Sequence, residues 1–194
     1  GQGAPPAHPG LLDNLSLSLI EKNWKLKDLV KEILLSRTYR QASLPKEGLS
    51  SFQAVQRLPA ESIRDNALAI SGLLVRDIGG PSIKPYQPAG YYRHLNFPAR
   101  KYTHHTDKRQ WRRGLYVHWQ RQFLHPMLKA FDAPRREECT TQRSRSNTPL
   151  AALVLLNDPT FVEAAKFFAQ RILKEGGSST NSRLVFAFRH AVSR

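Results

Sequence analysis

The stretch FDAPRREECTTQRSRSNTPLAALVLLNDP, which runs from Phe131 to Pro159, joins a dense run of charges to two signals for the start of a helix. Thr148-Pro149 and Asp158-Pro159 each pair a side-chain oxygen that can accept a hydrogen bond from a free backbone amide with a proline at the first helical position, where proline is tolerated. We therefore expect helices over residues 149–156 and 159–175, the second ending at Gly176-Gly177.

Apolar residues recur at helical spacing in five further segments of the chain. These segments predict helices over residues 11–20, 26–34, 60–78, 114–128 and 182–192, the third of them stopped by Gly79-Gly80-Pro81. For the fourth, a short strand over residues 114–119 is the alternative. The polar face of the second segment is typical of a helix that lies on a core. Glycine, proline and aromatic residues fill residues 79–110, which predicts a long irregular loop. The fold class is mainly α: an irregular helical domain with a long Gly/Pro/aromatic loop around residues 79–110.

The length of 194 residues allows one large domain or two small ones, and the 40% of hydrophobic residues suffice for a real core. We expect residues 1–194 to form a single domain with a flexible start at residues 1–9. No run approaches the roughly 18 apolar residues of a membrane span. The single cysteine, Cys139, excludes an internal disulfide.

The charge balance is far from even, with 30 Lys and Arg residues against 15 Asp and Glu residues and a formal net charge of +15 at pH 7. Such a field attracts polyanions, whether nucleic acid, acidic lipid or acidic glycan. The sequence contains no P-loop, no GxGxxG and no GxSxG motif, so nucleotide binding and α/β-hydrolase chemistry lack their usual signatures.

The charged residues after Phe131 are the first candidate site. Arginine can hold a carboxylate, sulfate or phosphate in two parallel hydrogen bonds, and a neighbouring carboxylate can act as acid or base. The candidate catalytic residues are Asp132, Glu138 and Asp158, and the candidate ligand-binding residues here are Arg135, Arg143, Asn147 and Asn157. The alternative is that these charges pair with one another and fix an irregular connection between helices.

The second candidate is the basic, aromatic stretch over residues 91–113. Cations beside aromatic rings suit a sugar polymer or single-stranded nucleic acid, and we select Tyr92, Arg112 and Arg113 as ligand-binding candidates. The alternative is a solvated loop whose rings pack into the core. No helix-turn-helix, RNP or zinc-finger signature accompanies the stretch, so nucleic acid is the weaker expectation.

Cysteine and histidine give no further site. Cys139 has no histidine beside it in the sequence to serve as a base, and we expect a buried, inert thiol. His104, His105 and Asp107 invite a metal interpretation, but adjacent histidines seldom bind one ion, and we expect no metal site. The absence of a CxxCH motif means that this segment cannot attach haem in the c-type manner.

Several blocks, in this order, resemble one known family. They are HPGLLDNL at 8–15, NWKLKDLVKEILLSRTYRQAS at 23–43, AESIRDNALAISGLL at 60–74, GGPSIKPYQPAGYY at 79–92, RRGLYVHWQR at 112–121, and the stretch that begins at Phe131. They are similar to the planctomycete-type C-terminal domain of unknown function that accompanies cytochrome-c-like modules. Asn14 and Asn23 depart from the family, which tends to carry an aromatic residue and a glycine at these positions.

The resemblance implies an extracytoplasmic location (periplasm, cell envelope or secreted) and a larger multidomain parent protein, of which this chain is a fragment. It implies that haem belongs to a separate module, that this segment holds no cofactor, and that preceding domains of the parent are partners. The family supplies no agreed reaction, so no catalytic residue is carried over from it.

These observations favour an accessory domain that binds a partner domain or an acidic polysaccharide through residues 131–158 and the basic loop. The alternative is a catalytic domain that acts on polysaccharide with a carboxylate acid/base and an arginine anion clamp. A second alternative is nucleic-acid binding through the basic surface.

Overall fold

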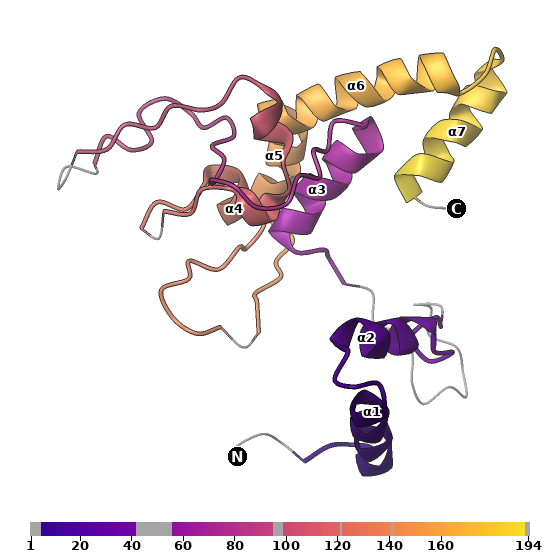
Figure 1. Cartoon of the computed structure of the whole chain (residues 1–194). Coiled ribbons are helices and arrows are strands. Elements are labelled where there is room, and N and C mark those ends of the chain that lie inside the picture. The colour runs from indigo at the N-terminus through magenta and orange to yellow at the C-terminus, as the bar shows by residue number, and fades with distance from the viewer. Residues whose placement is uncertain (1–4, 42–55, 95–98, 121, 141, 193–194) are drawn as a thin grey trace. The chain divides into compact units, whose positions relative to one another are not determined.

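The computed structural model of the chain describes residues 5–41, 56–94, 99–120, 122–140 and 142–192 (Figure 1). It divides into two compact units, residues 1–56 and residues 57–194. The expectation of a single domain stays a prediction. Of the expected flexible start, residues 1–4 lie outside the described residues, residues 5–8 are exposed and non-helical, and the first helix begins at Pro9.

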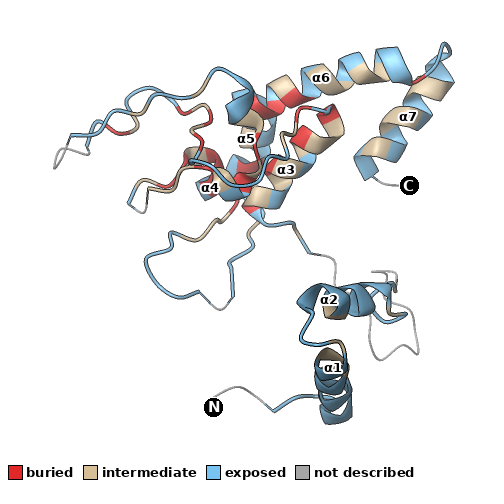
Figure 2. Cartoon of the chain, in the orientation of Figure 1, coloured by how far each residue is buried: buried red, intermediate tan, exposed pale blue. Residues whose placement is uncertain are grey.

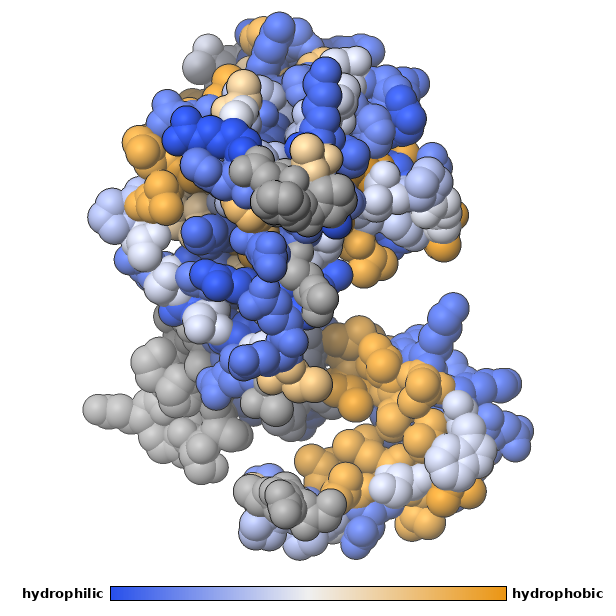
Figure 3. All heavy atoms as spheres, turned by 90° about the vertical axis from the view of Figure 1, so that its left-hand side faces the viewer, coloured by the Kyte–Doolittle hydropathy of each residue, from blue (hydrophilic) through white to orange (hydrophobic). Residues whose placement is uncertain are grey.

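The N-terminal unit contains helices α1 (Pro9–Glu21) and α2 (Leu26–Leu35), which confirms the first two predicted helices. Lys22 forms an ion pair with Glu32, and the Ser18 hydroxyl donates to the same carboxylate at 2.7 Å. Neither helix has a buried residue, although α2 has the pattern of a helix on a core. Two short helices contact each other along one line only, so their apolar faces stay exposed; hydrophobic side chains are conspicuous on the surface in Figure 3.

The C-terminal unit is built around helix α6. Its helices are α3 (Ala60–Ser71), α4 (Pro126–Ala130), α5 (Pro149–Asn157), α6 (Pro159–Glu175) and α7 (Thr180–Val192), and α6 contacts α3, α5 and α7. The buried residues gather where α3, α4, α5 and the first turns of α6 meet (Figure 2). Phe131 and Phe161 meet there edge to face, with ring centroids 5.8 Å apart. The prediction of a mainly helical fold is confirmed.

The two predicted helix starts are confirmed at atomic detail. The Thr148 hydroxyl accepts from the backbone N–H of Ala151 at 3.2 Å, and the Asp158 carboxylate accepts from that of Thr160 at 2.9 Å. Each cap satisfies a backbone amide that the helix itself leaves unpaired. Helix α6 ends at Gly176, as expected.

Helix α3 ends earlier than predicted. Its C-cap is Gly72, whose φ of +82° lies in the left-handed region that favours glycine. The prediction that the helix continues to Gly79 is therefore wrong, because Gly72 already provides the left-handed turn that ends it.

The predicted helix over residues 114–128 is also wrong. Two 3-10 turns, η1 (Lys108–Trp111) and η2 (Gly114–Tyr116), precede an extended segment, and α4 begins only at Pro126. Ile83 pairs with Val117 instead: its N–H donates to the Tyr116 carbonyl and its carbonyl accepts from the His118 N–H, both at 2.7 Å. Pairing with a distant segment overrides the helical spacing of the apolar residues.

The described part of residues 79–107 contains no helix, which confirms the long irregular loop up to η1. Two buried arginines fix its ends. Arg64 on α3 donates to the carbonyl of Arg112 at 2.7 Å and to that of Gln110. The Arg112 guanidinium donates to the carbonyls of Pro81, at 3.0 Å, and Gly79. Side-chain donors thus satisfy backbone carbonyls at both ends of the irregular region, beside the backbone pairing of Ile83.

Among the described helices, none combines the length and the apolar character needed to cross a bilayer.

Candidate functional site

The charged loop, residues 132–146, is closed at its base by Asp132. The Asp132 carboxylate accepts from the Ser146 N–H at 2.7 Å and from the Ser146 hydroxyl at 2.9 Å, and it forms an ion pair with Arg57. The backbone hydrogen bond from Ser146, more than the Arg57 charge, holds the pKa of Asp132 below its usual range. Asp132 itself lies at a φ of +58°. A loop whose ends meet in this way is an Ω-loop, and the hydrogen bonds of Asp132 hold its two ends together.

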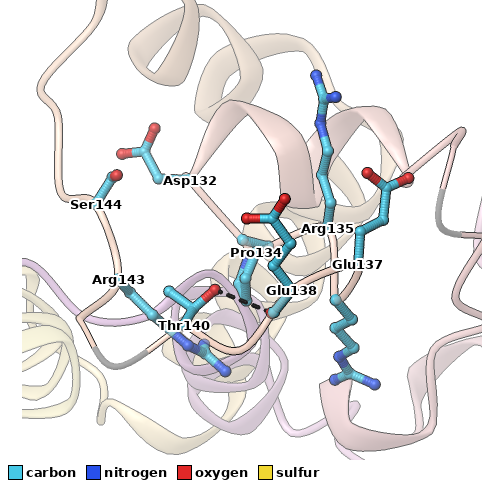
Figure 4. A pocket seen from close by; sticks show the side chains of 10 residues that line it. Asp132, Pro134, Arg135, Glu137, Glu138, Thr140, Arg143 and Ser144 are labelled. Atoms are coloured by element: carbon cyan, nitrogen blue, oxygen red, sulfur yellow. Dashed lines mark hydrogen bonds between the residues drawn. The ribbon is translucent and has the colours of Figure 1, made fainter.

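The loop encloses a hollow of about 450 Å³, which we call the loop hollow (Figure 4). Three acidic and three basic residues line it: Asp132, Glu137, Glu138, Arg135, Arg136 and Arg143. Figure 4 shows Arg135 and Arg143 on opposite sides of Glu138. Arg143 reaches Glu61 on α3, with 2.8 Å between the guanidinium nitrogen and the carboxylate oxygen. The loop hollow is therefore balanced in charge, and two of its charged groups are held by residues outside the loop.

Three of the predicted site residues lie away from this hollow. Asp158 caps α6, and burial raises the pKa of its carboxyl group. The Asn157 amide donates to the carbonyl of Leu153 within α5 at 3.0 Å. Asn147 is exposed at the residue before the α5 cap. The carboxylates Asp132, Glu138 and Asp158 thus do not line one hollow.

Cys139 is exposed, and the expectation of a buried thiol is wrong. The physical reason is its position: the neighbouring residues 135–140 are all exposed, so the loop brings no core to the thiol.

A second hollow of about 410 Å³ lies within the irregular region, and we call it the cationic hollow. Its lining comes from residues 86–93, 100–102 and 104, and includes Arg93, Arg100, Lys101 and His104 beside Tyr86, Tyr91, Tyr92 and Tyr102. The described residues that line it include no Asp or Glu. Arg93, Arg100, Lys101 and His104 are exposed. In Figure 3, which faces this projecting part of the molecule, the surface is mostly hydrophilic.

The tyrosines of the cationic hollow are held in place. Tyr92 is buried and meets Tyr102 edge to face at 5.3 Å between centroids; burial raises its pKa. The Tyr102 hydroxyl donates to the Pro85 carbonyl at 2.7 Å, and the Tyr91 hydroxyl donates to the Leu124 carbonyl at 2.9 Å. The Nε2 atom of the buried His125 lies 2.7 Å from the Tyr86 carbonyl oxygen. The exposed cations of the hollow thus lie beside tyrosine rings that hydrogen bonds and ring contacts hold in place.

Of the three ligand-binding candidates in the basic stretch, Tyr92 alone lines this hollow. Arg112 is buried, its guanidinium lies 4.1 Å from the centroid of the Tyr116 ring, and its N–H groups hold backbone carbonyls. Arg113 is half-buried, with its guanidinium 5.8 Å from the same ring.

Arg93, Arg100 and Lys101 are the residues that sequence reasoning passed over, although they lie in the stretch it singled out. One signal marks them: residues 78–106 contain no Asp or Glu, so a cation in this segment has no acidic neighbour along the chain.

The adjacent histidines do not converge on a common ligand. The His105 Nδ1 accepts from the backbone N–H of Lys84 at 3.1 Å, and His104 meets Tyr86 edge to face. Within the described part of the chain, no three His, Cys, Asp or Glu side chains form a group that could hold a metal ion.

Comparison with known families places the chain. The family described as PSD1, protein of unknown function (DUF1553), matches residues 1–194, and the chain belongs to this family. This confirms the resemblance to a family of unknown function; the association with cytochrome-c-like modules stays a prediction. No curated protein and no solved structure matches the chain.

Proposed function

We propose that this member of the PSD1 family is an accessory domain that binds acidic polysaccharide through the cationic hollow. One observation carries the proposal: exposed cations from two segments, including Arg93, Arg100 and Lys101, surround one hollow whose described lining has no carboxylate. Clustered cations repel one another, and a bound anion relieves this repulsion. The arrangement therefore suits an anionic ligand.

The donors in the hollow match sulfate or carboxylate groups. Arginine offers five N–H donors in a planar fork, and Arg100 donates one of them to the Gln120 side-chain oxygen at 2.7 Å. That bond orients the guanidinium, which then has further donors for an anion.

The loop hollow supports a catalytic role less well. A catalytic carboxylate must reach the substrate, and Asp132 already binds Arg57 and two donors of Ser146. Asp158 is committed to the start of α6. Glu138 is the one candidate carboxylate that is exposed on the loop.

The geometry also favours a glycan over a single-stranded nucleic acid. Bases stack on open ring faces, whereas Tyr91, Tyr92 and Tyr102 are packed against one another or Phe123. Nucleic acid is therefore an outcome that the experiment below must separate.

We place this binding outside the cytoplasm, in a parent protein that carries haem on a separate module, with preceding domains of the parent as further partners. The exposed apolar faces of α1 and α2 fit such a domain contact, because apolar patches of this kind mark interaction sites.

The test is a titration with heparin, polygalacturonate and a single-stranded oligonucleotide at several salt concentrations. We expect the chain to bind heparin or polygalacturonate more tightly than the oligonucleotide, and to lose affinity as salt rises. The double variant R100Q/K101Q should weaken polysaccharide binding roughly tenfold, since exposed ion pairs contribute up to about 1 kcal/mol each.

The matched control is K166Q/K174Q, which removes two exposed cations of α6 and should leave the affinity nearly unchanged. Absence of polysaccharide binding, equal losses in both double variants, or tighter binding of the oligonucleotide would overturn the proposal.

A further inference from the structure

Two neighbouring residues, Trp119 and Gln120, hold arginines from the two hollows. The Trp119 indole N–H donates to the backbone carbonyl of Arg135 at 3.3 Å, and the Arg136 guanidinium lies 3.7 Å from the centroid of a Trp119 ring. The next residue, Gln120, accepts from Arg100 of the cationic hollow at 2.7 Å. The start of the charged loop is therefore fixed beside the cationic hollow by one short segment.

The electrostatics of Tyr91 agree with this contact. Burial raises the pKa of the Tyr91 hydroxyl, and the positive charge of Arg135 opposes that rise. Tyr91 lines the cationic hollow, so the field of a charged-loop arginine reaches that hollow.

Arg135 and Arg136 differ from the third arginine of the loop hollow. Both are exposed, and a guanidinium stacked on a ring, as Arg136 is on Trp119, keeps its N–H edge directed away from the ring face. Arg143 is instead drawn to Glu61. The arginines thus divide into two that extend the cationic hollow and one that fastens the loop to α3.

We infer that Arg135 and Arg136 form a second subsite for the same polyanion, joined to the cationic hollow across Trp119 and Gln120. The inference rests on the proposed function and adds to it a preference for extended chains. A short acidic oligosaccharide fills the cationic hollow alone, whereas a longer one reaches both groups of cations and gains from their linkage. Glu137 and Glu138 beside the second subsite oppose the ligand.

The experiment compares a sulfated tetrasaccharide with a sulfated decasaccharide by calorimetry. We expect R135Q/R136Q to weaken binding of the decasaccharide several-fold, to lower the salt dependence of its affinity, and to weaken binding of the tetrasaccharide much less, through the field of Arg135 alone. R100Q/K101Q should weaken both ligands. E137Q/E138Q, which leaves the contacts to Trp119 in place, should strengthen the decasaccharide and not the tetrasaccharide.

The outcomes separate the inference from the proposed function. If the wild-type chain binds neither oligosaccharide, both fail. If it binds both but R135Q/R136Q leaves the decasaccharide unchanged, or weakens the two ligands equally, the second subsite is wrong and the cationic hollow stands. An unchanged E137Q/E138Q variant likewise contradicts a ligand that passes over the charged loop.

Discussion

The two hollows of the C-terminal unit are close in size, about 450 Å³ and 410 Å³, yet the loop hollow is balanced in charge and the cationic hollow is positive. The loop hollow has three acidic and three basic residues, and Arg57 and Glu61 from outside the loop draw two of these into ion pairs. The cationic hollow has cations and no described carboxylate. A high density of charged residues in sequence is therefore a weaker indication of a ligand site than an unbalanced charge in three dimensions.

The two hollows are also fastened by different chemistry. A carboxylate, Asp132, closes the charged loop, whereas neutral partners hold the cationic hollow, namely tyrosine hydroxyls and the His125 ring. Acidic pH and single substitutions should therefore change the stability and the ligand binding of the two hollows differently.

The largest expected effect is acid destabilisation through His125, which contacts the backbone carbonyl of Tyr86 in the lining of the cationic hollow. Burial lowers its pKa to about 4 from the usual 6.5. The unfolded chain takes up this proton near pH 6.5 and the folded chain only near pH 4, so stability falls as pH drops through that window. The loss amounts to about 3 kcal/mol by pH 4.

Urea unfolding across this pH range measures the effect. His125→Gln keeps an N–H donor for the Tyr86 carbonyl and should flatten the pH dependence; a smaller slope remains from His105 and His118, whose pKa values burial also lowers. An equally steep slope in the variant would show that His125 is not the group responsible.

The next effect concerns Asp132, which closes the charged loop. Asp132→Asn keeps the shape and tolerates the left-handed backbone, but it loses the charge that Arg57 and Ser146 bind. The free energy of unfolding should fall by about 2 kcal/mol, because hydrogen bonds to charged groups contribute on this scale. Binding of a sulfated tetrasaccharide by the folded variant should persist; its loss would place Asp132 in the binding site after all.

A single-charge comparison between the hollows should give a smaller effect. Arg100→Gln removes a cation from the cationic hollow and should weaken tetrasaccharide binding by about 1 kcal/mol or less. Arg143→Gln removes an equal charge that is already paired with Glu61, and should leave this binding unchanged. Equal losses in isothermal titrations would mean that net charge alone governs affinity, and would remove the distinction between the two hollows.

The smallest effect is expected at Cys139. Because the thiol is exposed, a neutral maleimide should label it in the folded chain without denaturant. The labelled chain should bind the tetrasaccharide as before, since the adduct lies on the charged loop. Labelling that requires denaturant would show that the loop covers the thiol in solution.

Local signals allowed part of this structure to be predicted. Thr148-Pro149, Asp158-Pro159 and Gly176 act through their immediate neighbours, so the bounds of α5 and α6 could be inferred from sequence. Residues 114–128 have equally regular apolar spacing, but their backbone pairs with Ile83, and no local pattern records that pairing.

The candidate site was limited in the same way. The choice of Asp132 and Arg143 was reasonable from their neighbours along the chain, yet their partners Arg57 and Glu61 lie more than seventy residues away. Only the three-dimensional structure shows which charged groups already form ion pairs. The run without acidic residues at 78–106 was visible in the sequence and points to the cationic hollow directly.

The closure of the charged loop by Asp132 and Ser146 has a consequence for how this region can vary. Because Asp132 and Ser146 hold the two ends of the loop together, the residues between Arg136 and Arg143 can change in number without disturbing α4 or α5. Doubling the length of a flexible loop costs only about 0.6 kcal/mol in closure entropy. The part of the loop between Arg136 and Arg143 is thus a place where a longer peptide could be inserted while the contacts to Trp119 and Glu61 remain.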